Sequence, residues 1–191
     1  VVSAHGITSP AESRKRGLPV VLVINGIHAG EVEGKEASLM LVRDILAGKH
    51  GDVLARMTLV VVPLFNADGN DRISSENRKL DIANFSGQLG PDSGVGTRVN
   101  AAGINLNRDY MRQEAPEMRL MQTGVAQRWN AHLTIDCHAT NGSIHRFALT
   151  YDIPHTVDSG RREPIDYMRE RLLPAVRSAV KAKDDLDTFY Y

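Results

Sequence analysis

Cysteine is almost absent from this sequence, and neither sign of charge is in excess. Cys137 is the one cysteine in 191 residues, which excludes an internal disulfide framework and a zinc site built from cysteines. Lys+Arg and Asp+Glu both number 23, so the net charge does not indicate a nucleic-acid or anionic-membrane partner. No run approaches the roughly 20 apolar residues of a membrane-spanning helix. What remains is an ordinary globular composition, with 42% hydrophobic residues and enough length for a substantial core.

The chain begins at Val1 rather than at a methionine and ends at Tyr191. It shows no secretory signal peptide, but we expect a processed or truncated piece of a longer protein, so this absence carries little weight. We expect one domain over residues 1–191, incomplete at its C-terminus. An exported location, periplasmic or secreted, is favoured over the cytoplasm. The sequence does not indicate the oligomeric state.

Apolar runs and helical periodicity alternate along the chain. The apolar runs predict strands at residues 20–24, 57–63, 133–137 and 147–151. The spacing of apolar residues predicts helices over residues 33–47, 115–131 and 165–183. Pro174 is expected to interrupt or kink the last helix. Strands alternating with helices predict an α/β fold, a three-layer α/β/α sandwich with a mixed, mostly parallel sheet.

Polar side chains stand where the predicted strands end. His28 and Glu31 follow the first strand, and His138 follows the third. Residues 66–69, Asn-Ala-Asp-Gly, follow the second strand and are predicted to form a turn. In open α/β sheets ligands bind at the carboxyl ends of the strands, so we expect these three loops to meet at one edge. The long irregular stretch over residues 70–103 is expected to be functional, because such loops are uncommon in compact domains.

The first candidate site is a metal site. His28 and Glu31 offer a nitrogen and a carboxylate three residues apart, and His138 offers a distant second nitrogen. Two close ligands and one distant ligand leave a coordination position open, as in catalytic zinc sites. His-x-x-Glu alone is a weak signal that also fits a turn histidine and a helix N-terminal carboxylate. Strand alternation puts Asp136 on the side of His138, where it could hold a neighbouring imidazole.

The second candidate site would bind a carboxylate. Asn107 and Arg108 place an amide beside a guanidinium, which binds carboxylates through two parallel hydrogen bonds. Arg98 lies upstream in a glycine-rich stretch. The alternatives are that Arg108 pairs with Asp109 or Glu114 on the surface and that Arg98 is simply solvated.

Together these residues resemble the zinc metallocarboxypeptidase family, typified by pancreatic carboxypeptidase A. The ordered match covers about residues 20–142: His28-x-x-Glu31, Asn66-Ala67-Asp68-Gly69, Arg98 with Asn107-Arg108, and His138. The resemblance implies that one zinc ion is bound by His28, Glu31 and His138. It also implies that Asn107 and Arg108 hold the terminal carboxylate of the substrate, while Arg98 stabilises the oxyanion formed when a zinc-activated water attacks the scissile amide.

Two departures from the family pattern stand out. Asn105 occupies the position where the family usually has an aspartate that orients a zinc-binding histidine. The family's general base is a glutamate on a late strand, whereas Glu163 and Glu170 are the only glutamates after His138 and belong to the predicted last helix. We therefore expect that the chain ends before the strand that carries this glutamate.

The leading hypothesis is a zinc-dependent hydrolase that removes C-terminal residues from peptides. An alternative is an N-acyl amino acid deacylase of the aspartoacylase type, whose metal site looks similar and whose substrate also carries a carboxylate. A further alternative is a non-catalytic zinc-binding relative. The expected partner is a peptide or acyl-amino-acid substrate with a free carboxylate, with no nucleic acid or membrane partner.

Overall fold

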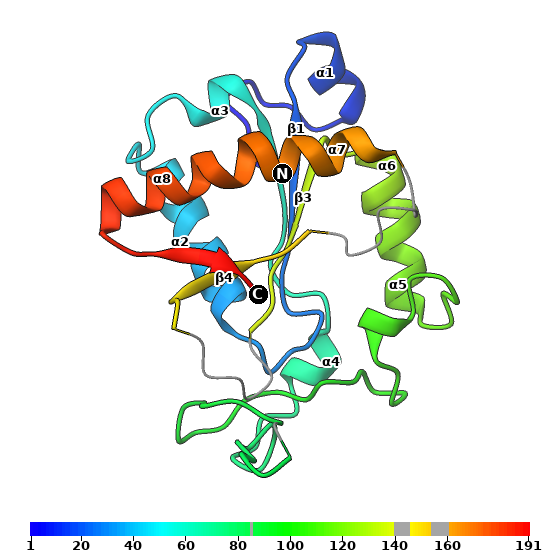
Figure 1. The fold of residues 1–191 in the computed structure, drawn as a ribbon. Coiled ribbons are helices and arrows are strands. Elements are labelled where there is room, and N and C mark those ends of the chain that lie inside the picture. The colour runs from blue at the N-terminus through cyan, green and yellow to red at the C-terminus, as the bar shows by residue number, and fades with distance from the viewer. Residues whose placement is uncertain (85, 140–145, 154–160) are drawn as a thin grey trace. The chain divides into compact units, whose positions relative to one another are not determined.

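The computed structural model describes residues 1–84, 86–139, 146–153 and 161–191 (Figure 1). The chain divides into two compact units, Val1–Ser143 and Ile144–Tyr191. The expectation of one domain over the whole chain stays a prediction. The end of the segment after His138, residues 140–142, lies outside the described residues.

A parallel sheet forms the centre of the first unit. Its strands β1 (Val20–Ile24), β2 (Thr58–Val62) and β3 (Leu133–Asp136) lie in the order β2-β1-β3. Both pairings are parallel, so all three strands end at the same edge. These strands confirm the sequence prediction to within one residue at each end. The sheet is parallel because a helix or long segment separates each pair of strands and returns the chain to the opposite end.

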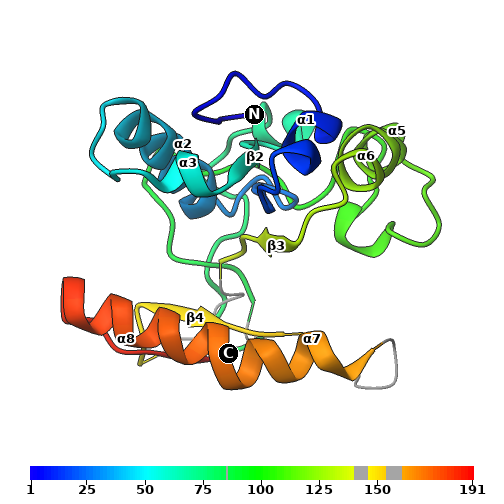
Figure 2. The same cartoon turned by 90° about the horizontal axis from the view of Figure 1, so that it is seen from above.

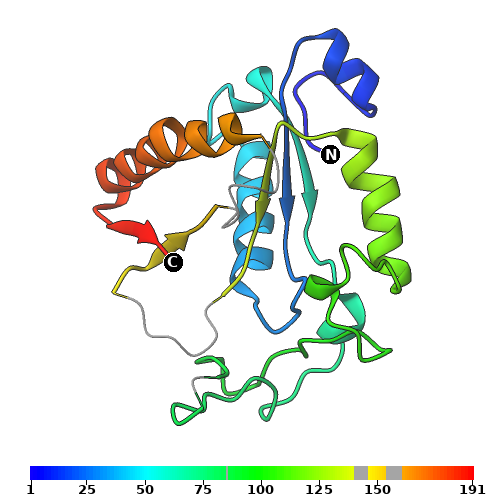
Figure 3. The ribbon, with the colours of Figure 1, turned by 45° about the vertical axis from the view of Figure 1, so that its right-hand side comes forward.

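Helices cover both faces of this sheet. α2 (Glu33–Leu46) follows β1, while α5 (Pro116–Leu120), a π-helical segment (Met121–Ala126) and α6 (Gln127–Trp129) precede β3. Figures 2 and 3 show α2 on one side of the strands and the α5–α6 run on the other, which confirms the predicted three layers. The helices expected over 33–47 and 115–131 are confirmed, but the π-helical middle of the second was not predicted.

The main core lies between the sheet and the α5–α6 run. Alternate residues of β1, namely Val20, Leu22 and Ile24, point to this side and are at most 3% exposed. From the helical run, Met118 and Trp129 pack into the same cluster. Full burial of one such side chain contributes about 1.5–3 kcal/mol, so this layer holds the strand ends in place.

The start of α2 lies close against the end of β3. Gly34 allows this approach, because a Cβ atom there would lie 2.5 Å from Cys137 Cβ and 2.7 Å from Asn25 Oδ1. The apolar residues that gave the helical periodicity are less well covered, since Met40 is 53% and Leu46 72% exposed. The pattern therefore predicted the helix correctly but not the burial of its apolar face.

Short helices account for most of what the sequence prediction missed in this unit. α1 (Pro10–Lys15) has a capping box between Ser9 and Glu12, and α3 (Val53–Arg56) precedes β2. The turn predicted at residues 66–69 is wrong in type, because α4 (Ala67–Asn70) is a single helical turn. The physical reason is its cap: Asn66 accepts the Gly69 N–H with its side chain and continues the turn into a helix. The irregular stretch after it is confirmed, with isolated bridges in place of strands.

The second unit pairs β4 (Leu149–Tyr151) with β5 (Thr188–Tyr190) in parallel. Between them run α7 (Arg162–Tyr167), a π-helical segment (Met168–Leu172) and α8 (Leu173–Asp184). The predicted interruption is confirmed just before Pro174, which has no N–H to donate to the preceding turn. β5 was not predicted. No described helix has the length and apolar character needed to cross a membrane.

The close approach of α2 to β3 gives a stability prediction. Gly34→Ala should lower the free energy of unfolding by about 1–3 kcal/mol, because the new methyl group overlaps Cys137. Gly124→Ala is the matched control, since nothing lies within 4 Å of its added Cβ and it sits in the exposed part of a helical run. This control should gain about 0.5–1 kcal/mol. Urea unfolding measures both, and equal effects would contradict the packing of α2 described above.

Candidate metal centre

The three predicted ligands meet at the carboxyl edge of the sheet. His28 and Glu31 lie in the loop between β1 and α2, and His138 lies two residues beyond the end of β3. Because β1 and β3 are parallel neighbours, with Ile24 beside Asp136, the segments that follow them start side by side. One ligand atom from each of the three residues lies within 4.8 Å of the others.

The Glu31 carboxylate is the centre of this cluster. Its Oε1 lies 2.9 Å from His28 Nδ1, and its Oε2 lies 3.0 Å from His138 Nδ1. The backbone N–H of Ala139 donates to Oε2 at 3.0 Å. Burial would raise the pKa of Glu31, but the hydrogen bonds of His138 and His28 outweigh it and hold the pKa well below its usual range. The carboxylate is therefore ionised although it is 3% exposed.

The contacts of His28 define which ring nitrogen faces the carboxylate. Asn105 Oδ1 accepts the Asn107 N–H and lies 3.1 Å from His28 Nε2, so Nε2 donates to it. Nδ1 lies 2.9 Å from Glu31 Oε1 and 3.3 Å from Arg98 Nη1. Nδ1 is therefore the ring nitrogen that faces the Glu31 carboxylate.

His138 repeats this arrangement. Asp136 Oδ2 lies 3.2 Å from His138 Nε2, which leaves Nδ1 toward Glu31. Two imidazole nitrogens facing one carboxylate need a cation between them, either protons or a metal ion. Two nitrogens and a carboxylate oxygen form a donor set that suits zinc. The prediction that Asp136 holds an imidazole thus fits the structure, and the imidazole is that of His138 itself.

Two arginines reach the cluster. Arg98 is the predicted one; its Nη1 lies 3.8 Å from Glu31 Oε1 and its side chain is 34% exposed. Burial lowers the pKa of Arg98, and the positive charges of Arg78 and Arg108 lower it further, while Glu31 opposes them. Arg78 was missed: its Nη2 lies 2.9 Å from Glu31 Oε1 and its side chain is only 8% exposed. The irregular loop was expected to be functional, but no spacing in it distinguished Arg78.

The Asn-Ala-Asp-Gly motif supports the segment that carries Arg98. The Thr97 N–H donates to Gly69 O at 2.9 Å, and the Ala101 N–H donates to Asp68 Oδ2 at 3.2 Å. The two bonds lie on either side of Arg98 and fix its backbone to α4. The motif therefore contributes to the site by holding the backbone on both sides of Arg98.

Asn107 and Arg108 lie on a short 3-10 turn beside the cluster, Leu106–Arg108. Leu106 is fully buried in the main core, which anchors this turn. Asp109 is also buried and accepts backbone N–H groups, one of them from Glu114. The alternative pairing of Arg108 with Asp109 or Glu114 is therefore not seen; Arg108 donates to the Asn107 carbonyl and its side chain is exposed.

Among the described residues, the carboxylates bonded to the cluster are Glu31 and Asp136, and both are already engaged with imidazoles. Glu163 and Glu170 belong to the helices of the second unit. Glu163 pairs with Arg161 at 3.0 Å and is exposed, as is Glu170. Neither shows the buried, engaged environment of a catalytic acid or base.

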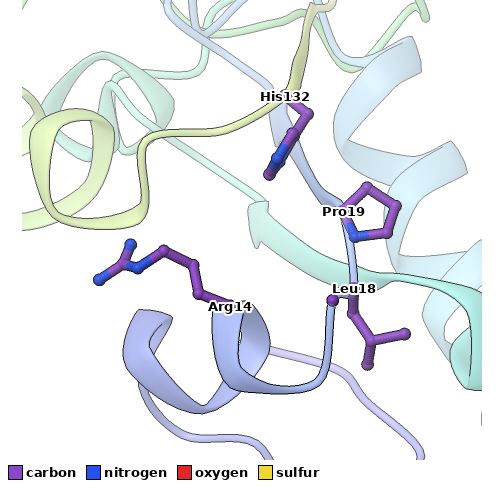
Figure 4. Close-up of a pocket in the computed structure, with 5 residues that line it drawn as sticks. Arg14, Leu18, Pro19 and His132 are labelled. Atoms are coloured by element: carbon purple, nitrogen blue, oxygen red, sulfur yellow. The ribbon is translucent and has the colours of Figure 1, made fainter.

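A separate hollow of about 340 Å³ lies at the opposite end of the strands (Figure 4). It is lined by Arg14, Gly17, Leu18, Pro19 and His132. His132 Nδ1 accepts the Val20 N–H at 3.0 Å, which makes it a structural histidine. The chemistry-bearing residues lie at the other edge of the sheet, so this hollow is not part of the metal cluster.

A parallel α/β sheet with two imidazoles and a carboxylate meeting at its carboxyl edge is an arrangement that suits a catalytic metal ion. The family model for zinc carboxypeptidase matches residues 2–147, and the chain belongs to this family. The family resemblance and the carboxypeptidase-like α/β fold are thereby confirmed, as is zinc-dependent peptide hydrolysis at the level of the family. No curated protein and no solved structure gave a match to the chain.

The environment of His138 predicts the pH dependence of metal binding. Hydrogen bonds to Asp136 and Glu31 raise the pKa of His138 to about 9 in the metal-free chain. Below this pH a metal ion must displace its proton, so zinc binding at pH 7 should release about one proton from His138, and affinity should rise with pH. Titration calorimetry in buffers of different ionisation enthalpy measures this release.

Asp136→Asn is the control, because Asp136 contributes most to the raised pKa of His138. Its loss should lower that pKa, so proton release at pH 8 should fall below that of the unaltered chain. Equal release from both proteins at pH 8 would contradict the role of Asp136.

Proposed function

We propose that this chain carries the zinc site and the carboxylate-binding site of a hydrolase that removes C-terminal residues from peptides. The observation that carries the proposal is the meeting of His28, Glu31 and His138 within 4.8 Å, beside Arg98. Membership of the zinc carboxypeptidase family supports it.

The two Nδ1 atoms of His28 and His138 and the carboxylate of Glu31 would hold the metal. When bound, a zinc ion supplies Lewis-acid polarisation of a carbonyl and lowers the pKa of a water molecule toward about 7. Asn105 and Asp136 hold the far nitrogens of the two imidazoles, which fixes their tautomers and ring orientation. Asn105 performs this task without the charge of the aspartate that the family usually has there.

Arg98 is suited to hold the oxygen of the scissile carbonyl. In the metal-free chain its Nη1 lies 3.3 Å from His28 Nδ1, the atom that would bind the metal ion. Its guanidinium is partly exposed and would then turn its donors to the substrate. A fixed donor beside developing negative charge lowers a barrier by about 3–4 kcal/mol in acyl transfer.

Charge around the cluster favours an anionic substrate. Arg78, Arg98 and Arg108 outnumber the two carboxylates of Glu31 and Asp136, even before a divalent metal ion is added. The side-chain amide of Asn107 has no hydrogen-bond partner among the described residues, and Arg108 is exposed beside it. An amide and a guanidinium on one turn would hold a terminal carboxylate in a defined orientation.

The first test is metal content. The unaltered chain should bind one zinc ion, and His28→Ala, Glu31→Ala or His138→Ala should each weaken binding so far that little zinc remains after dialysis. His50→Ala is the control, since His50 is exposed and follows the C-terminal end of α2, whereas Glu31 precedes its start, and it should keep full zinc content. Atomic absorption measures the content. Full zinc in one of the three variants would remove that residue from the ligand set.

The second test concerns the carboxylate. Arg108→Met should weaken binding of a blocked dipeptide with a free carboxylate about 10- to 100-fold, through loss of a charge-assisted hydrogen bond worth about 1.5–3 kcal/mol. The same dipeptide as its C-terminal amide should bind weakly to both proteins. Arg112→Met is the matched control, because Arg112 is exposed and pairs with Glu114. Equal losses for carboxylate and amide would contradict the role of Arg108.

Turnover separates the alternatives that the sequence left open. Hydrolysis of the blocked dipeptide supports the peptidase, whereas hydrolysis of an N-acyl amino acid alone supports the deacylase. Carboxylate-dependent binding without turnover of either supports a non-catalytic zinc-binding relative.

A further inference from the structure

The long loop after α4 places a nearly buried arginine, Arg78, against the metal cluster. Figure 3 shows this loop running beneath the carboxyl ends of β1 and β2. Arg78 belongs to it, is nearly buried, and places Nη2 2.9 Å from Glu31 Oε1. Arg78 competes with a metal ion for the negative charge of Glu31. The presence of a buried arginine beside a predicted metal ligand therefore requires an explanation.

Arg78 is held at both ends of its guanidinium. Its Nε donates to Gln88 Oε1 at 2.7 Å, while Nη2 faces Glu31. Gln88 is itself buried and donates through Nε2 to Gly30 O at 2.6 Å, and its backbone N–H donates to Arg78 O at 2.8 Å. The contacts form a closed chain from Gly30 through Gln88 and Arg78 to Glu31, one residue after Gly30.

The backbone is adapted to this placement. Arg78 has φ of 52°, a left-handed conformation that costs a residue other than glycine about 1–2 kcal/mol. Gly30 has no side chain where the Arg78 stem passes, and a Cβ there would also lie 2.6 Å from Gly96 O. The loop is braced nearby, since Asn77 Nδ2 donates to Val95 O at 2.9 Å. Backbone strain and close packing at one position indicate that the surrounding structure holds the Arg78 guanidinium in a single place.

Arg78 also has a counterpart on the other side of the carboxylate. The Ala139 N–H donates to Glu31 Oε2, as Arg78 donates to Oε1. Each carboxylate oxygen has two lone pairs, so one donor on each oxygen leaves a second lone pair on each toward the imidazoles. Arg98 differs, because it is partly exposed and bonds the cluster through longer contacts.

We propose that Arg78 is a positioning residue, held by Gln88, that fixes the plane of the Glu31 carboxylate so that one oxygen faces each imidazole before a metal ion binds. This inference rests on the proposed zinc site. It divides the two arginines between tasks: Arg78 orients a ligand, and Arg98 remains available to the substrate.

Cobalt(II) is the probe, because its visible absorption reports ligand geometry without any need for turnover. Arg78→Gln should weaken Co²⁺ and Zn²⁺ binding about 10- to 100-fold, the usual effect of losing a partner of a metal ligand, and should change the visible spectrum of the Co²⁺-loaded chain. Arg72→Gln is the matched control, with the same charge change on an exposed arginine of the same loop, and should change neither. Chelator competition measures affinity.

Gln88→Met provides a second variant that leaves Arg78 and Glu31 intact. It should shift the metal affinity and the Co²⁺ spectrum in the same direction as Arg78→Gln, by a smaller amount. If circular dichroism shows that Arg78→Gln does not fold, the result for Gln88→Met tests the inference in its place. Unchanged Co²⁺ spectrum and affinity in a folded variant, with or without a loss of stability, would overturn the inference and leave Arg78 as a loop brace. Failure of the unaltered chain to bind Co²⁺ or Zn²⁺ would instead overturn the proposed function and this inference with it.

Discussion

One buried carboxylate organises the functional end of this protein. Glu31 receives His28 on one oxygen and His138 with the Ala139 N–H on the other. These groups come from the segments that follow two neighbouring strands of one parallel sheet, so the carboxylate links the loop after β1 to the segment after β3. An ionised carboxylate in such a buried place must be surrounded by donors, and the positions of nearby side chains follow from this need.

The cluster is held in place by packing residues outside it. The core between β1 and the α5–α6 run fixes the strand ends, and Gly34 brings the start of α2 against Cys137. Buried Leu106 anchors the turn that carries Asn107 and Arg108, while α4 anchors the backbone around Arg98. The polar side chains of the site thus stand on rigid elements, which is what precise positioning of a site requires.

Much of the fold could be predicted from the sequence because it depends on local patterns. Continuous apolar runs predicted β1, β2 and β3, and apolar spacing predicted the helices between them. The missing N–H of Pro174 predicted an interruption that the structure shows as a π-helical segment. The capping box at Ser9 and Glu12 was a local signal that could have predicted α1. The exposed apolar face of α2 could not be predicted, because burial depends on what lies opposite a helix.

By itself, the sequence determined the identity and order of the candidate ligands. A histidine and a glutamate three residues apart after one strand, and a histidine after another, are fixed by residue types and by the ends of strands. Strand alternation already placed Asp136 on the side of His138. Tertiary structure decided the other two partners, Asn105 on His28 and Arg78 on Glu31. Loops that lie far apart in the sequence bring these partners together. Their positions depend on backbone strain and tight packing, which outweigh any local preference. No spacing in the sequence records that geometry.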